Sequence, residues 1–302
     1  MKKRIAVCIS GQLRTFEDIW LDNNKILNDS QNVEIDYFCY FWKKNGNTWR
    51  TLDGNNRYIN NLFLDPFIYY PSKNEEIVKK SSIEKIISAK KISIALDNEE
   101  KLLNKDNVLE LVENYPGNKK MAFASFCLWK SVYECNNLRN LYEKENNIKY
   151  DAVVRIRPDW KLKKNPIQKY LSNNNDLLFF DSSAQKGINK GYQKVTDVCF
   201  ISKPLIMDLI ANLYHKLIDE IEVNGWKKFD FASDDHLNRL IGESALYWFI
   251  ESENIKINDY VEERYGYIYR SAYKGVYEKK IFSIKLLIKQ MLEMPDKFIK
   301  SL

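Results

Sequence analysis

The stretch YDAVVRIRPDW, Tyr150 to Trp160, is the part of the sequence that says most about the fold. Its first half is typical of a buried strand, because Val153 and Val154 are β-branched and apolar. Pro158 ends the run, since a proline cannot donate a hydrogen bond within a sheet. We therefore predict a strand that leads directly into a polar turn.

Two arginines and a carboxylate stand at the end of this predicted strand. Arg155, Arg157 and Asp159 lie within five positions, and alternate side chains of a strand share one face. Guanidinium groups hold phosphate oxygens in pairs and keep their charge. Because buried charges need partners, two interpretations stand. The arginines bind phosphate, or they form a salt-bridge network with Asp159 that caps the sheet.

Strands alternate with helical segments along the rest of the chain. Apolar or β-branched runs predict strands, and apolar residues at helical spacing predict helices. The predicted strands are 4–10, 33–42, 62–70, 151–157, 176–183 and 195–202, and the predicted helices include 121–147, 204–217 and 236–253. This alternation indicates an α/β fold with a mostly parallel sheet flanked by helices.

Two segments differ from this pattern. Between Lys73 and Asn118 the chain is rich in Lys, Glu, Asn and Ser with short helical patterns, which predicts a solvated helical insertion. Residues 276–302 carry apolar positions at helical spacing among lysines, which predicts a basic amphipathic helix. We expect one domain over residues 1–275, insertion included. For residues 279–292, contact with an anionic membrane and packing on the domain or on a second subunit, as in a homodimer, both stay open.

Composition excludes several functional classes. Two histidines, and five cysteines without a Cys-x-x-Cys pair, argue against a zinc site and are typical of reduced thiols in the cytoplasm. The net charge of +6 comes from 47 basic and 41 acidic residues that are interspersed, which argues against nucleic acid. Because no apolar run is long enough to span a bilayer, we expect a cytoplasmic protein, at most peripheral on the inner face of the membrane.

Polar residues also follow other predicted strands. Gly11, Gln12 and Arg14 come directly after the first strand, and Asp197 lies in the stretch VTDVCFIS. Ligands of α/β sheets bind beyond the carboxyl ends of the strands, so we expect these residues to face one site. Glycine lets a ligand approach the backbone, and Gln12 and Arg14 supply directional donors. The alternative for this turn is an ordinary strand–helix connection with a surface arginine.

The stretch DFASDDHL, 230–237, places two carboxylates at a predicted helix start. Aspartate and serine are the residues that a helix N-cap requires. We interpret one of Asp234 and Asp235 as a cap, and Asp235 stays a candidate acid–base residue.

Several stretches together resemble a known family. ISGQLRTF, IDYFCYFW, LYEKENNIKYDAVVRIRPDW, VTDVCFIS and GESALYWFIESENIKI, which continues to YGYIYR, occur in this order. They resemble bacterial glycosyltransferases of lipopolysaccharide and capsule assembly, a group also met in large DNA viruses. The resemblance covers residues 4–270 apart from the insertion. It implies the GT-A fold, in which one α/β domain binds a nucleotide sugar.

The resemblance implies a donor-binding set at six positions: Gly11, Gln12, Arg14, Arg155, Arg157 and Asp159. The last three stand where GT-A enzymes usually carry Asp-x-Asp. Asp159 is then the candidate ligand for a divalent cation, Mn²⁺ or Mg²⁺. The alternative is that the arginines meet the charge of the leaving group in place of a metal.

The resemblance also implies candidates for catalysis. Asp197 matches an acidic position of the family, and Glu243 opens its last conserved helix, where Gly242 replaces the usual proline. Sugar transfer needs charge stabilisation at the leaving phosphate, expected from Arg157 and Arg155, and an inverting enzyme needs a carboxylate base. The base is Asp197 or Glu243, with Asp235 third.

We therefore expect a glycosyltransferase that moves a sugar from a nucleotide-activated donor to a growing surface glycan. Its partners would be the nucleotide sugar and the glycan acceptor. The alternative is a degenerate transferase, which binds a nucleotide sugar or a glycan without transfer.

Overall fold

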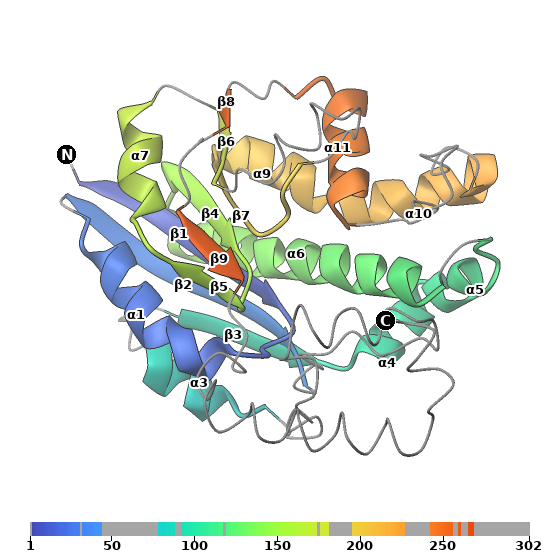
Figure 1. Cartoon of the computed structure of the whole chain (residues 1–302), viewed down its shortest axis with the longest axis horizontal. Helices are drawn as coiled ribbons and strands as arrows, with labels where there is room; N and C mark the ends of the chain where they lie inside the picture. Colours follow the sequence, from blue (N-terminus) through green and yellow to red (C-terminus); the bar gives the residue numbers. More distant parts are fainter. Residues whose placement is uncertain are drawn as a thin grey trace, which may run out of the picture.

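A computed structural model describes residues 2–30, 32–43, 78–87, 92–116, 119–173, 176–180, 195–226, 242–255, 259–260 and 265–268. Its strands are β1 (Lys3–Gly11), β2 (Val33–Trp42), β3 (Ile92–Asp97), β4 (Ala152–Ile156), β5 (Trp160–Leu162), β6 (Leu177–Phe179), β7 (Cys199–Ser202), β8 (Asp259–Tyr260) and β9 (Gly266–Ile268). Its helices are α1 (Phe16–Asn28), α3 (Lys80–Ile87), α4 (Glu99–Lys105), α5 (Val108–Glu113), α6 (Lys119–Asn146), α7 (Pro166–Ser172), α9 (Pro204–Ala211), α10 (Leu213–Asn224) and α11 (Gly242–Ser252). The helices flank a central sheet (Figure 1).

The central sheet of the described ranges has seven strands in the order β3-β2-β1-β4-β7-β6-β8. β1 runs parallel to β2 and β4, and β2 runs parallel to β3. β7 is antiparallel to both of its neighbours, β4 and β6, whereas β6 and β8 are parallel. The sheet is therefore mixed and mostly parallel, which confirms the predicted α/β fold class. β5 and β9 form a small antiparallel sheet, and β5 packs against α1.

Alternate residues of β1 contribute to two hydrophobic cores. Ala6 and Cys8 belong to the core that includes α6, and Ile5, Val7 and Ile9 belong to the core that includes α1. A strand buried on both faces is apolar throughout, which explains the uninterrupted run of β1. The long helix α6 packs along β1 and β2 and so covers one face of the sheet.

The expectation of a solvated helical insertion over Lys73–Asn118 is incomplete. The segment contains α3, α4 and α5, but it also contains β3, which pairs in parallel with β2 and extends the central sheet. The reason is visible in ISIALD, where Ile92, Ile94 and Leu96 alternate with small residues and pack on the α1 side. The segment is therefore part of the sheet and of both cores.

Other predictions lie outside the described residues. These are the strand at 62–70, the helix start with Asp234 and Asp235, the amphipathic helix at 276–302 and the domain boundary before it. All of them stay predictions. Within the described ranges, none of the helices combines the length and hydrophobicity that a crossing of a bilayer requires.

Candidate active site

The turn after β1 has an unusual backbone at two positions. Gly11 has φ +121°, a conformation that strains any residue with a side chain, and a Cβ there would lie 3.8 Å from Pro158 Cδ. Arg14 adopts the left-handed region with φ +47°. A non-glycine residue in this region is uncommon, and such outliers concentrate at functional sites. This conformation accompanies a contact between the Arg14 side chain and the turn after β4.

Helix α1 holds the turn after β4. Trp20 Nε1 donates to the carbonyl oxygen of Pro158 at 2.8 Å. Asn23 Nδ2 donates to Trp160 O at 2.8 Å, and Asn23 Oδ1 accepts from the Leu162 amide at 2.8 Å. Trp20 and Asn23 are fully buried. Because these hydrogen bonds are shielded from water, the Arg-Pro-Asp-Trp turn has a fixed position relative to α1.

One buried carboxylate joins two arginines at this edge of the sheet. Asp159 is 1% exposed, and it accepts from Arg157 Nε at 3.0 Å and Nη2 at 3.1 Å. Arg14 Nη1 donates to Asp159 Oδ2 at 2.8 Å, and Arg14 Nε donates to Gln12 Oε1 at 3.3 Å. The side chains of Arg14 and Arg157 are 25% and 19% exposed. We call Arg14, Asp159 and Arg157 the arginine clamp.

Two further carboxylates lie beside the arginine clamp. Asp197, 4% exposed, has its Oδ2 3.6 Å from Arg157 Nη1, which is longer than a hydrogen bond. Glu243 is half-buried in the first turn of α11. Burial lowers the pKa of Arg157, but the charges of Asp159, Asp197 and Glu243 raise it above its ordinary value. Arg157 is therefore a fixed cation.

Gly242 explains how α11 reaches this site. A Cβ at Gly242 would lie 2.4 Å from Leu128 Cδ2 on α6 and 3.7 Å from Asp197 Oδ2. The first distance is a steric clash, so a side chain here would require the Leu128 side chain to move. Gly242, the first residue of α11, thus lies close to both Leu128 and Asp197.

Arg155 has a different environment from Arg157. It is 1% exposed, and within the described ranges its Nε, Nη1 and Nη2 have no hydrogen-bond partner. Burial lowers the pKa of Arg155 to about 10, against the opposing attraction of Asp197. A donor that approaches from solvent therefore meets Arg14 and Arg157 before Arg155.

The surroundings of Asp159 do not fit a divalent cation. Mn²⁺ and Mg²⁺ need several oxygen ligands, but both carboxylate oxygens of Asp159 accept hydrogen bonds from arginines. In the part of the chain that the structure describes, no three His, Cys, Asp or Glu residues are grouped to hold a metal. The two guanidinium groups would also repel a cation placed at this carboxylate.

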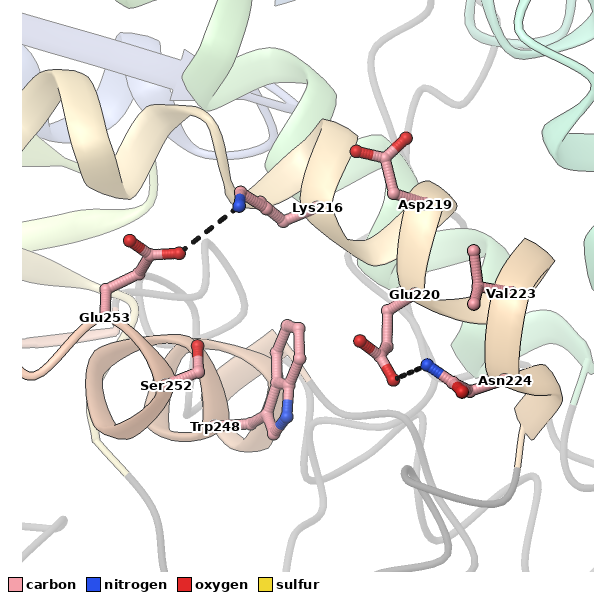
Figure 2. Close-up of a pocket in the computed structure, with 8 residues that line it drawn as sticks. All are labelled: Lys216, Asp219, Glu220, Val223, Asn224, Trp248, Ser252 and Glu253. Carbon is pink, nitrogen blue, oxygen red and sulfur yellow. Dashed lines mark hydrogen bonds and ion pairs between the residues drawn. The ribbon is translucent and has the colours of Figure 1, made fainter.

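A shallow hollow of about 290 Å³ lies elsewhere, between α10 and α11 (Figure 2). Trp248 faces it, Lys216 Nζ lies 3.5 Å from Glu253 Oε1, and Asn224 Nδ2 donates to Glu220 Oε1 at 2.6 Å. None of the predicted site residues lines this hollow.

The structure thus brings together most of the predicted site. Gly11, Gln12 and Arg14 meet Arg157, Asp159 and Asp197 at one edge of the sheet, Glu243 lies near Arg157, and Asp235 is outside the described residues. Sequence reasoning missed Trp20 and Asn23. Their spacing places them on one face of α1, but nothing in the sequence says which turn this face contacts.

No protein-family model and no curated protein sequence matches the chain. Several solved structures align with much of the chain at low similarity. For mouse xyloside xylosyltransferase 1 in its apo form, the TM-score is 0.35 and the identity 8% over 84% of this chain and 83% of that chain. For an active-site mutant of LgtC, the TM-score is 0.38 and the identity 8%, over 82% of this chain and 69% of that chain. For the bifunctional glycosyltransferase WbbM, the TM-score is 0.31 and the identity 11%, over 72% of this chain and 34% of that chain.

Proposed function

We propose that the chain is a glycosyltransferase that moves a sugar from a nucleotide-activated donor to a growing surface glycan, as in capsule or lipopolysaccharide assembly. The arginine clamp carries this proposal. Arg14 and Arg157 share the carboxylate of Asp159, so the clamp has one excess positive charge, and both arginines keep part of their side chains exposed. This arrangement suits a phosphate group. The resemblance of the sequence motifs supplies the reaction class.

In the proposed reaction, the bond between the anomeric carbon of the sugar and the donor phosphate breaks. The bonding electrons leave with the nucleoside diphosphate, and Arg157 and Arg14 stabilise the added negative charge. The new bond forms between the anomeric carbon and an acceptor hydroxyl oxygen. In an inverting transfer the hydroxyl proton passes to a carboxylate, for which Asp197 and Glu243 are the candidates near Arg157.

A thermal-shift panel followed by a turnover assay tests this function. The panel consists of nucleoside diphosphates and CMP, each with EDTA and with Mn²⁺. We expect one nucleotide to raise the Tm, and we expect the corresponding nucleotide sugar to be consumed when acceptor glycans are supplied. Failure of every nucleotide to raise the Tm, with no donor consumed, would contradict the proposal. A raised Tm without turnover under any acceptor would instead identify a binding protein.

A further inference from the structure

Arg155 is a buried cation without a hydrogen bond. It lies on β4, is 1% exposed, and none of its three side-chain nitrogens has a hydrogen-bond partner among the residues that the structure describes. Arg139 on α6 is equally buried, but it donates to Asn136 at 2.9 Å, to Glu143 at 2.6 Å and to Asp208. An isolated buried charge is strongly unfavourable. The chain therefore carries, directly beneath its candidate site, a group that is poorly satisfied in this state.

A carboxylate with incomplete pairing lies within electrostatic range of Arg155. Asp197 exerts the strongest charge attraction on Arg155, ahead of Asp159. Asp197 is itself buried, and its contact with Arg157 is 3.6 Å. β4 and β7 are paired, with Arg155 opposite Phe200, and the Arg157 amide donates to Val198 O at 2.9 Å. The segment that carries Asp197 is thus fixed next to both arginines.

We propose that Arg155 is a positioning residue that becomes the partner of Asp197 when a phosphate ligand engages Arg157. The inference rests on the proposed function. A diphosphate at the arginine clamp competes for the N–H groups of Arg157, so Asp197 loses its cation. Among the described residues Arg155 makes no hydrogen bond, so it can pair with Asp197 without first breaking another contact. Asp197 then keeps a cationic partner and its position beside the arginine clamp.

A double-mutant cycle between Arg155 and Asp197 tests the exchange. Wild type, Arg155→Met, Asp197→Asn and the double variant are unfolded in urea, with and without saturating inorganic pyrophosphate. We expect the coupling between the two positions to grow by about tenfold in the unfolding equilibrium constant when pyrophosphate is present. Coupling that is unchanged by pyrophosphate, or a wild type that pyrophosphate does not stabilise, would overturn the inference.

Matched substitutions separate this role from a structural one. Arg155→Met removes an unsatisfied charge and keeps most of the volume, so its Tm should equal or exceed that of wild type. Arg139→Met should lower the Tm, because Asp208 and Glu143 lose the cation that pairs with both of them. A lowered Tm in Arg155→Met as well would show a structural role instead. The same coupling predicts a pyrophosphate affinity about tenfold lower in Arg155→Met, whereas a loss of more than about 100-fold would show direct ligand contact. Either the lowered Tm or this larger loss of affinity overturns the inference.

Turnover distinguishes this inference from the proposed function. If the chain transfers sugar, Arg155→Met should reduce kcat by about 100-fold and raise donor KM by no more than about tenfold, and Arg155→Lys should recover part of the loss. Unchanged kcat in a folded Arg155→Met would overturn the inference and leave the transferase proposal intact. If the coupling grows with pyrophosphate but the chain transfers no sugar, the inference about Arg155 stands and the transferase proposal fails.

Discussion

The carboxylate of Asp159 accepts hydrogen bonds from both Arg14 and Arg157 while it is only 1% exposed. This single carboxylate therefore holds both guanidinium groups within hydrogen-bond distance of itself. Hydrogen bonds between a buried carboxylate and guanidinium groups are charge-assisted, so Asp159 and the two arginines stabilise one another. Asp159 thus acts in two ways, as a structural anion and as the support of a cationic surface.

Asp159→Asn tests this role of the carboxylate. The substitution keeps the shape but removes the negative charge that Arg14 and Arg157 share. We expect the free energy of unfolding to fall by about 3 kcal/mol, as when one partner of a buried ion pair is removed. Asp151→Asn is the control, because its ion pair with Lys3 is solvent-exposed and should contribute less than about 1 kcal/mol. Urea denaturation measures both, and equal losses would contradict the assignment.

The occupied oxygens of Asp159 also predict how the activity depends on metal. Because arginines already bond both oxygens, we expect sugar transfer in EDTA to stay within about twofold of transfer in Mn²⁺. Initial rates at saturating donor provide the measurement. A loss of activity in EDTA of more than about tenfold, restored by Mn²⁺ but not by other salts, would show that a metal ion does the work assigned here to the arginine clamp.

At the scale of elements, α1 is the support of the site. Trp20 and Asn23 on one face of this helix bond the backbone on both sides of Asp159. The turn after β1 leads into α1, so the turn that carries Arg14 and the turn that carries Arg157 are fixed to one helix. This arrangement makes the separation of the two arginines a property of helix–turn packing.

Asn23→Ala tests the contribution of α1. The substitution removes the Asn23 hydrogen bonds of the Trp160 carbonyl and the Leu162 amide. Each buried group that loses its partner lowers the free energy of unfolding by about 1–3 kcal/mol. We expect a clear drop in the urea midpoint and a lower affinity for nucleotide. Asn146→Ala is the control, because its hydrogen bond to Tyr142 O is exposed. A midpoint for Asn23→Ala that matches the control would show that α1 does not hold the turn.

Element by element, the sequence predicted some features and not others. β1, β2, β4 and β7 were predicted because central strands buried on both faces are long apolar runs. The strand β3 was missed because its apolar and small residues are embedded in a Lys-rich, Asn-rich segment whose composition favours helices. At the site, the spacing of Arg157 and Asp159 indicated their proximity, but the left-handed backbone of Arg14 and the packing of Gly242 on Leu128 depend on contacts distant in sequence.

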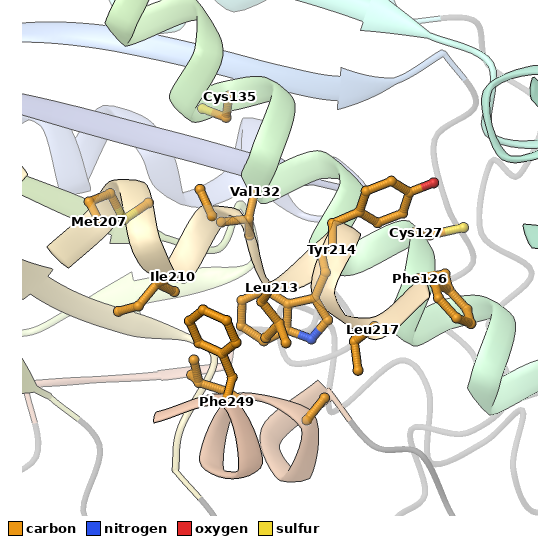
Figure 3. Close-up of a cluster of buried hydrophobic side chains, with 14 of the residues drawn as sticks. Phe126, Cys127, Val132, Cys135, Met207, Ile210, Leu213, Tyr214, Leu217 and Phe249 are labelled. Carbon is orange, nitrogen blue, oxygen red and sulfur yellow. The ribbon is translucent and has the colours of Figure 1, made fainter. Parts of the chain in front are cut away.

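At the scale of the whole molecule, the change of strand direction assembles the site. β7 is antiparallel to β4, so the start of β7 lies at the same edge of the sheet as the end of β4. Asp197, just before β7, therefore meets Arg157, just after β4. On the α6 side, a core that joins α6, α9, α10 and α11 holds the helix that carries Glu243 (Figure 3).

Phe249→Ala tests this core. Phe249 is 1% exposed and lies among residues of α6, α9 and α10 (Figure 3). Its truncation should lower the free energy of unfolding by about 3–5 kcal/mol, because it leaves a cavity in the core. Leu205→Ala on α9 is the control, since Leu205 is 71% exposed and should change stability by less than about 0.5 kcal/mol. A loss below about 1 kcal/mol for Phe249→Ala would contradict this packing.

The affinity of the Arg157→Lys variant for a nucleoside diphosphate, measured calorimetrically in EDTA, tests the central claim most directly. Lysine keeps the positive charge but cannot form paired hydrogen bonds with phosphate oxygens or with Asp159. If the arginine clamp holds the donor phosphates, the folded variant should bind the nucleotide selected by the thermal-shift panel at least about tenfold more weakly than wild type. Wild-type affinity in the folded variant would contradict the account.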